Sequence, residues 1–321
     1  MTSLSPAMNS ELHPDLDPNR YVVQRFDGRG FSQCYVHEGI GGIPLVLVHG
    51  WPETKRIWWR VIGPLVDAGF EVIVPDLRGF GDSEVGPGGP AGGFGDVPTH
   101  AHDVHALINH LGHQRVVLAA GDLGGPVIQD LSARFASVVD RLVLFNSPLP
   151  FLRQAMTGMR TRPAAEASDY FIRQGTDADA LAGELTTPAQ RIRYISTFYT
   201  SRFWAHPGSF DADAVLFHTA PFADADHLRA GFRAYESSFT STARSEAPMI
   251  GVNNTSTLIL FGLSDHVIYP EFDLMAAQVF PNHVGPFLLR NCGHFVPWEA
   301  AHAFTTATVA FCGDLLNAQQ Q

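Results

Sequence analysis

Short apolar runs rich in β-branched residues alternate with stretches of helical periodicity along most of the chain. These runs predict eight strands, at residues 21–26, 33–37, 44–48, 70–75, 115–119, 141–145, 257–261 and 286–289. We expect the first two to form an antiparallel pair. Because the later strands alternate with helices, the pattern predicts an α/β fold in which a mostly parallel central sheet carries helices on both faces.

The clearest predicted helix covers about residues 98–111. Its apolar positions recur at i, i+3, i+4 and i+7 and so share one face, which we expect to meet the core: Val104, Leu107, Ile108 and Leu111. Five histidines cluster around the same helix: His100, His102, His105, His110 and His113. They lack the spacing of a ligand set on one face, so we interpret them as a solvated helix face and expect no metal site. A last helix is expected at about 298–315.

Residues 148–247 interrupt the alternation of strands and helices. No strand pattern is evident there, and aromatic residues are scattered through helical stretches. This pattern predicts a helical cap inserted between two parts of one core, at residues 21–147 and 248–321. Residues 1–20 mix Pro, Asp, Ser and Asn without an apolar run, and they predict a flexible arm that is not a leader peptide.

Composition narrows the class of protein. Of 321 residues, 45% are hydrophobic and 17% are charged, which is typical of a folded globular chain. A net charge of −11 disfavours binding to nucleic acid and to anionic lipid, and no apolar run is long enough to cross a bilayer. The three cysteines, Cys34, Cys292 and Cys312, have no metal or redox spacing. We therefore expect a cytoplasmic protein. A homodimer is the assembly that we consider for it.

Small residues surround one aspartate just after the strand at 115–119. The sequence AGDLGG at residues 120–125 places Asp122 between them, and a helix is predicted to follow. Small residues on both sides of a central side chain are typical of a tight strand-to-helix turn, because neighbouring backbone must pass without a Cβ in the way. Such a turn can present a nucleophile, although an aspartate in this place is also a common helix N-cap.

Other strand ends carry the residues that a nucleophile needs. The sequence HGWP at 49–52 follows the third strand, GLSD at 262–265 ends the seventh, and NCGH at 291–294 ends the eighth. Together with the tight turn predicted at Asp122, called the nucleophile elbow, and the interrupted alternation of strands and helices, these motifs resemble the α/β-hydrolase superfamily over residues 21–316. The resemblance implies that Asp122, Asp265 and His294 act as nucleophile, acid and base, in that chain order. It also implies that the N–H groups of Trp51 and Leu123 form the oxyanion hole.

The acid is the position in this assignment for which the sequence offers alternatives. Some relatives carry it after the preceding strand, but here that place is near Asn146, which has no charge. Asp265 takes the role by elimination, and Glu271 and Asp273 stay as less favoured alternatives. An aspartate nucleophile attacking an acyl carbon would give a reactive anhydride, whereas attack on saturated carbon gives an ordinary alkyl ester. The absence of GxSxG and the presence of Asp122 therefore disfavour esterase and lipase chemistry.

Two subfamilies with an aspartate nucleophile differ in what leaves. An alkoxide released from an epoxide needs a proton donor such as tyrosine, whereas a halide needs only weak donors. The segments DYFIRQG at 169–175 and GFRAYE at 231–236 resemble the cap segments of epoxide hydrolases that carry the ring-opening tyrosines, which would be Tyr170 and Tyr235 here. The aromatic residues expected to line an apolar epoxide pocket are Trp51, Phe171, Phe198, Phe232 and Phe295.

The resemblance thus implies an epoxide hydrolase that uses water, needs no cofactor and no metal, and forms a covalent ester on Asp122. A haloalkane or haloacid dehalogenase with the same three residues is the main alternative, but such enzymes usually place Trp or Arg after the nucleophile, where this chain has Leu123. A non-catalytic binding protein on this scaffold is the other alternative. The resemblance also implies a cis peptide bond between Trp51 and Pro52.

Overall fold

An eight-stranded sheet forms the centre of the protein in a computed structural model, which describes residues 13–163 and 165–319. The strands are β1 (Val23–Gly28), β2 (Phe31–Glu38), β3 (Ile43–Val48), β4 (Phe70–Pro75), β5 (Val116–Ala120), β6 (Val139–Phe145), β7 (Ser256–Gly262) and β8 (His283–Leu289). Their order is β1-β2-β4-β3-β5-β6-β7-β8. Strand β2 runs antiparallel to β1 and β4, and all other neighbours are parallel. The predicted α/β class and antiparallel opening pair are confirmed.

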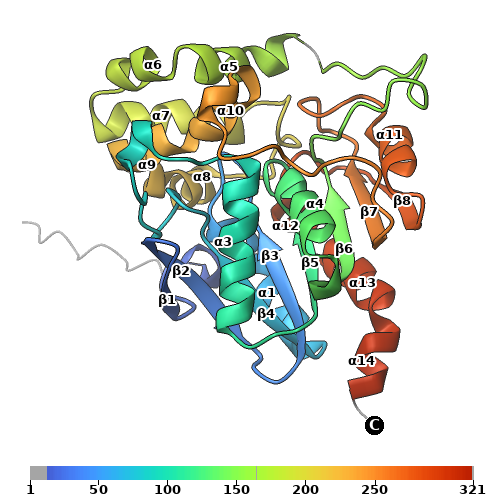
Figure 1. Ribbon diagram of the computed structural model, residues 1–321. Helices are drawn as coiled ribbons and strands as arrows, with labels where there is room; N and C mark the ends of the chain where they lie inside the picture. Colours follow the sequence, from blue (N-terminus) through green and yellow to red (C-terminus); the bar gives the residue numbers. More distant parts are fainter. Residues whose placement is uncertain (1–12, 164, 320–321) are drawn as a thin grey trace, which may run out of the picture.

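Helices cover both faces of the sheet. The α-helices are α1 (Trp59–Asp67), α2 (Gly89–Gly92), α3 (Val97–His110), α4 (Gly124–Arg134), α5 (Ala165–Thr176), α6 (Ala178–Glu184), α7 (Pro188–Tyr199), α8 (Ala212–Thr219), α9 (Ala225–Gly231), α10 (Arg233–Phe239), α11 (Phe272–Val279), α12 (Val296–Glu299), α13 (Ala301–Phe311) and α14 (Gly313–Gln319). Short 3-10 helices are η1 (Pro14–Leu16), η2 (Lys55–Trp58), η3 (Ala136–Val138), η4 (Ala220–Ala223) and η5 (Ser241–Ala243). Helices α3 and α4 pack side by side on one face, while α1, α12 and α13 pack together on the other (Figure 1).

The central strands are buried on both faces. Leu45, Val46, Leu47 and Val48 of β3 have no exposed surface, as expected for a parallel strand with helices above and below it. Each such aliphatic side chain contributes about 1.5–3 kcal/mol when it is removed from water. This rigid layer fixes the positions of the loops that leave the carboxyl ends of the strands.

Helices α5 to α10 follow β6 in the chain and precede β7, and they lie over one end of the sheet (Figure 1). Their aromatic side chains join the same hydrophobic cluster as the sheet. Helix α7 is also tied to the core by a hydrogen bond, because the hydroxyl of Tyr199 donates to the carbonyl of Pro52 at 2.6 Å. This inserted group of helices therefore contacts the loop that follows β3.

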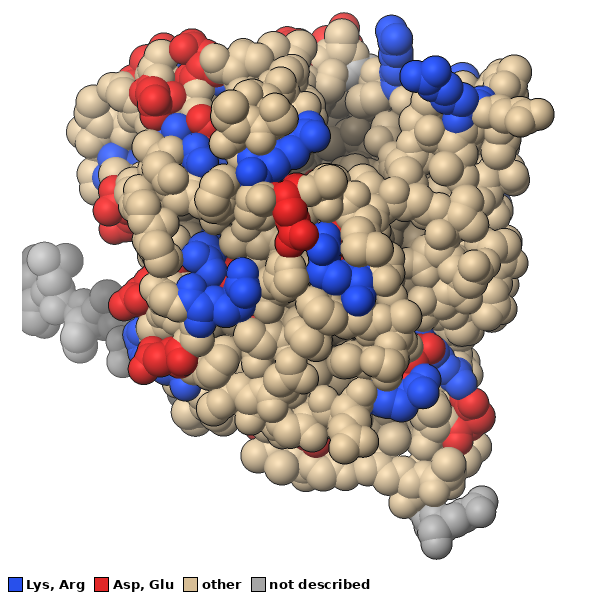
Figure 2. All heavy atoms as spheres, viewed as in Figure 1, with Lys and Arg blue, Asp and Glu red and all other residues tan. Residues whose placement is uncertain are grey.

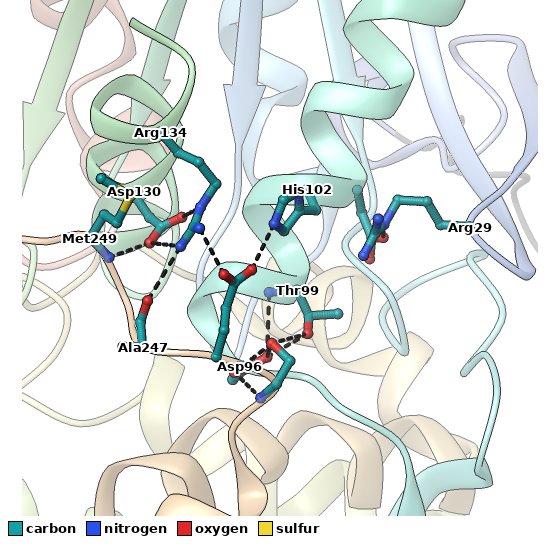
Figure 3. Close-up of polar contacts among 11 residues, drawn as sticks. Arg29, Asp96, Thr99, His102, Asp130, Arg134, Ala247 and Met249 are labelled. Atoms are coloured by element: carbon teal, nitrogen blue, oxygen red, sulfur yellow. Dashed lines mark hydrogen bonds and ion pairs between the residues drawn. The ribbon is translucent and has the colours of Figure 1, made fainter.

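The segment that returns from the cap to β7 is held against α3 and α4 (Figure 3). The carboxylate of Asp96, at the N-cap of α3, accepts the N–H of Ser245 at 2.7 Å. Asp130 of α4 accepts the N–H of Met249 and pairs with Arg134 at 2.8 Å. These contacts fix the cap's return path to two helices of the core.

Three expectations differ from the structure. The helix expected at 298–315 is divided into α12, α13 and α14, because Ala300 (φ −131°, ψ 41°) leaves the helical region and Gly313 starts a new helix. His100 is buried rather than solvated, since its side chain faces the core beside Phe80. Residues 13–20 of the expected arm lie against α1, where Trp59 donates its indole N–H to the carbonyl of Asp17 at 3.0 Å; residues 1–12 are outside the described part.

Basic and acidic side chains are interspersed on the face drawn in Figure 2, without one large basic surface. Among the described residues, no helix combines the length and the apolar character that a membrane span requires.

Candidate active site

Asp122 lies at a sharp turn between β5 and α4. Its φ of +43° is in the left-handed region, which a non-glycine residue adopts only where its surroundings enforce it. The small neighbours are needed: a Cβ on Gly121 would lie 2.2 Å from the Phe145 ring, and one on Gly124 would lie 2.6 Å from the carbonyl of Val48. The turn thus presents the Asp122 carboxylate to the loops that carry Trp51 and His294.

Three side chains from different strand ends meet at this turn. His294 Nε2 lies 3.1 Å from Asp122 Oδ2, and its Nδ1 lies 2.8 Å from Asp265 Oδ2. All three side chains are at least 90% buried. Asp265 is fixed in turn by the N–H groups of Val267 and Ile268, which both donate to its Oδ1. The structure therefore brings the predicted nucleophile, base and acid into one hydrogen-bonded row.

The electrostatics of this row favour a proton on His294. Burial alone lowers the pKa of the imidazole, but the charges of Asp265 and Asp122 outweigh burial and hold the pKa of His294 well above its usual range. If either carboxylate lost its charge, this pKa would fall. The protonation state of His294 is therefore coupled to the charge of Asp122.

The loop after β3 contacts the other carboxylate oxygen of Asp122. The N–H of Trp51 donates to Asp122 Oδ1 at 2.7 Å, and the expected cis bond between Trp51 and Pro52 is present. Leu123 stands at the N-cap of α4, where a backbone N–H has no partner within the helix. Glu53 accepts the N–H of Gly50 at 2.7 Å, and burial raises the pKa of Glu53 to about 7, with the charge of Asp122 adding to the rise.

Two tyrosines of the inserted helices lie close to this row, near enough for the charge of Asp122 to act on both. The rings of Tyr170 (α5) and Tyr235 (α10) lie 5.7 Å apart at 81°, and both contact Trp51, at 5.5 Å and 5.4 Å between ring centroids. Burial raises the pKa of both hydroxyls well above the usual range, and the charge of Asp122 adds to each rise. Both hydroxyls therefore stay protonated at neutral pH.

The expected pocket residues contact this pair to different degrees. Phe198 packs on Trp51 and on Tyr170, at 4.8 Å and 5.4 Å. Phe171 packs edge-on against Tyr235 at 5.4 Å, and Phe295 lies beside His294 at 5.3 Å. The ring of Phe232 contacts the ring of Tyr194 instead of those of Tyr170 and Tyr235. Trp204, which we did not expect at the site, lies 5.1 Å from Tyr170 and 4.8 Å from His294.

Asn146 is a further residue that the sequence does not identify. Its backbone carbonyl accepts the N–H of Asp122, its Oδ1 accepts the N–H of Gly262 and its Nδ2 donates to the carbonyl of Gly293, each at 2.9 Å. It thereby contacts the loops of the predicted nucleophile, acid and base at once. The only early signal is its place after β6, where some relatives of this fold carry the acid.

One group of side chains among the described residues has the composition of a metal site. His37, Glu71 and His113 bring their ligand atoms within 4.8 Å of one another. His37 Nε2 and His113 Nε2 lie 2.6 Å and 3.0 Å from the same Glu71 oxygen. The two histidines therefore contact the Glu71 carboxylate directly. The group lies at the start of β4, away from Asp122. It also means that His113 is not part of a solvated helix face.

The chain is similar in sequence and in structure to known proteins. The sequence profile of the family described as alpha/beta hydrolase fold matches residues 43–301. A soluble epoxide hydrolase from Corynebacterium sp. strain C12 is 31% identical over 273 residues, which cover 84% of this chain and 90% of that protein. A haloalkane dehalogenase from Mycolicibacterium paratuberculosis is 29% identical over 289 residues, which cover 84% of each protein. The solved structure of epoxide hydrolase CorEH without ligand has a TM-score of 0.76 and 25% identity, covering 92% of this chain and 99% of that one.

Proposed function

The chain belongs to the α/β-hydrolase fold family, among its epoxide hydrolases, and from this premise we propose that it converts an apolar epoxide into a vicinal diol through an ester on Asp122. The observation that carries the proposal is the pairing of a buried carboxylate at the elbow with two protonated phenols above it. A carboxylate attacks saturated carbon, and the phenols supply the acid that a leaving alkoxide needs.

In the first step, Asp122 Oδ2 attacks a ring carbon of the epoxide and the C–O bond breaks. The oxygen that leaves takes a proton from Tyr170 or Tyr235, which becomes a phenolate. Asp122 Oδ1 keeps its hydrogen bond from the Trp51 N–H and becomes the carbonyl oxygen of the ester. The imidazolium of His294 then returns a proton to the phenolate through water, which leaves His294 neutral.

In the second step, neutral His294 takes a proton from a water molecule, and the hydroxide attacks the ester carbon of Asp122. Loss of the Asp122 charge in the ester favours this step, because one of the two carboxylates that raise the pKa of His294 is then neutral. The oxyanion that forms is stabilised by the N–H groups of Trp51 and Leu123, each worth about 3 kcal/mol where such donors have been measured. The ester then breaks, the proton of the added hydroxyl passes to the diol alkoxide, and the carboxylate is restored.

Trapping of the ester tests this proposal directly. His294→Gln would be incubated with a panel of terminal aryl and alkyl epoxides that includes styrene oxide, and its mass would be measured intact and after digestion. A mass gain equal to the epoxide on the peptide that contains Asp122 is expected, because attack needs no neutral base and hydrolysis does. Asp122→Asn is the matched control and should gain no mass. Unmodified Asp122 with every epoxide would contradict the proposal.

The phenols are tested separately. Tyr235→Phe should slow ester formation by about 10²–10⁴, the usual contribution of a positioned general acid. Tyr194→Phe is the matched control, because Tyr194 is also a cap tyrosine but its hydroxyl accepts the side-chain N–H of Gln174 at 2.9 Å. Equal rates in Tyr235→Phe and wild type would remove Tyr235 from the proposed mechanism.

A dehalogenase is the second candidate, because the buried indole N–H of Trp51 has no hydrogen-bond partner among the described residues and could donate to a halide. Halide release from haloalkanes or haloacids without turnover of epoxides would favour it. Diol formation without halide release favours the epoxide hydrolase.

The proposal also includes the cellular compartment and the assembly state of the enzyme. We place the enzyme in the cytoplasm, which its three free and buried cysteines support. A homodimer is supported by exposed apolar side chains on the edge strand β8, namely Val284, Phe287 and Leu288. Cell fractionation and light scattering test these two statements.

A further inference from the structure

A partly buried carboxylate lies beside the loop of the proposed base. Glu299 of α12 accepts the N–H of Gly293 at 2.9 Å and the N–H of Phe295 at 3.0 Å, which are the residues on either side of His294. Burial raises the pKa of Glu299, and its hydrogen bonds oppose the rise. A carboxylate in this position fixes the backbone on both sides of the imidazole.

The same carboxylate also holds the cap. The oxygen that accepts from Gly293, Oε2, accepts the N–H of His206 at 2.8 Å and the hydroxyl of Ser209 at 2.9 Å. Both residues belong to the segment between α7 and α8. Four donors from two parts of the chain, far apart in sequence, therefore converge on one side chain.

Backbone contacts bring the cap segment and the base loop together around this carboxylate. The N–H of His294 donates to the carbonyl of Trp204 at 2.6 Å. A Cβ on Gly293 would lie 2.4 Å from that carbonyl and 2.7 Å from the N–H of His206, so only glycine allows this approach. The base loop cannot move without disturbing residues 204–209, and the reverse also holds.

We propose that Glu299 is a positioning residue that holds His294 in line with Asp122 and makes this alignment depend on the seating of cap residues 204–209. The proposal rests on the function proposed above. It concerns the second step most, because attack by Asp122 requires no proton transfer by His294, whereas hydrolysis of the ester does. Loss of the Glu299 contacts should therefore slow hydrolysis more than ester formation.

Glu299→Gln tests this selectivity. The side chain keeps its size, but one of its two accepting oxygens becomes an N–H₂ group, so at least one of the four donors faces another donor. We expect hydrolysis of the ester to slow by about 10- to 100-fold, in line with a displacement of the base by up to 1 Å, and ester formation to stay within about threefold. In steady state, the share of enzyme that carries the Asp122 ester should rise, as measured by quenching and intact mass.

The control is Glu271→Gln. Glu271 also joins the core to the inserted segment, through two bonds from Arg160 at 3.0 Å and 2.7 Å, but it does not touch the base loop. This variant should leave the share of ester unchanged. A purely structural effect of Glu299→Gln would lower the amount of active enzyme and leave that share unchanged too, which would overturn the proposal.

If Glu299→Gln does not fold, Ser209→Ala decides, because it removes one donor to the carboxylate from the cap side and leaves Glu299 in place. A raised share of ester in this variant supports the proposal, and an unchanged share overturns it. All measurements use the panel epoxide that gives the most ester in wild type. Absence of any ester in wild type and in His294→Gln would instead contradict the proposed function, so the two failures are distinguishable.

Discussion

Replacement of Gly50 by alanine tests how the loop after β3 positions the nucleophile. A Cβ on Gly50 would lie 2.4 Å from the Cβ of Asp122 and 2.6 Å from its Oδ1. Ordinary contact begins near 3.4 Å, so either the loop or the carboxylate must move by about 1 Å. Each movement separates Oδ1 from the Trp51 N–H, which now donates to it at 2.7 Å.

A displacement of this size at a reacting group costs about 10²-fold in rate, or about 2.7 kcal/mol of barrier. We therefore expect Gly50→Ala to form the Asp122 ester about 100-fold more slowly, with a loss of about 1–3 kcal/mol in the free energy of unfolding from overpacking. Rapid quenching with intact mass measures the first quantity, and urea unfolding measures the second.

Gly183→Ala is the control for this substitution. Gly183 lies inside α6, and a Cβ there would meet no atom within 4 Å. Its rate should equal that of wild type, and its stability should rise by about 0.5–1 kcal/mol, because alanine suits a helix better than glycine. The steric reasoning is refuted if Gly50→Ala forms the ester at the wild-type rate.

Three further predictions concern stability, each measured by urea unfolding. Tyr199→Phe leaves the buried carbonyl of Pro52 without its donor, so we expect a loss of about 1–3 kcal/mol; an unchanged value would show that water replaces the hydroxyl. Asp96→Ala frees the N–H of Ser245 and the start of α3, so about 2 kcal/mol should be lost and trypsin should cut near residue 245 sooner. Because burial raises the pKa of Glu53 from 4.5 to about 7, its protonated form stabilises the fold below pH 4.5 and this contribution is lost as pH rises through 7. Wild type should therefore lose stability relative to Glu53→Gln across that interval, and a constant difference would contradict the shift.

The strands and the tight turn at Asp122 were predictable because the local sequence determines them. Every predicted strand lies within three residues of an observed one. The central parallel strands were predictable because they are buried and so form continuous apolar runs. Glycines 121 and 124 indicate the tight turn at Asp122 because a side chain at either place would collide with a neighbour. The buried position of His100 was also within reach, because it is four residues before Val104 and so belongs to the apolar face of α3.

Contacts between distant parts of the chain were not predictable in this way. Asn146 and Gly293 are 147 residues apart, and Glu299 and His206 are 93 apart. No local pattern signals a side chain whose partners are backbone N–H and carbonyl groups of other loops. Trp204 was visible only as one aromatic residue among several in the inserted segment, because helical periodicity does not tell which ring faces the core.

The packing of rings above Asp122 has a consequence for the choice of substrate. Trp51, Tyr170, Tyr235 and Phe198 contact one another where an epoxide must enter, and Asp122 is only 6% exposed. A molecule that enters must part some of these rings, and each pair contributes about 0.5–1.5 kcal/mol. An epoxide with a broad hydrocarbon surface replaces the lost contacts with its own, whereas a very small one does not. We therefore expect the packed rings near Asp122 to favour epoxides that carry a large apolar group over small ones.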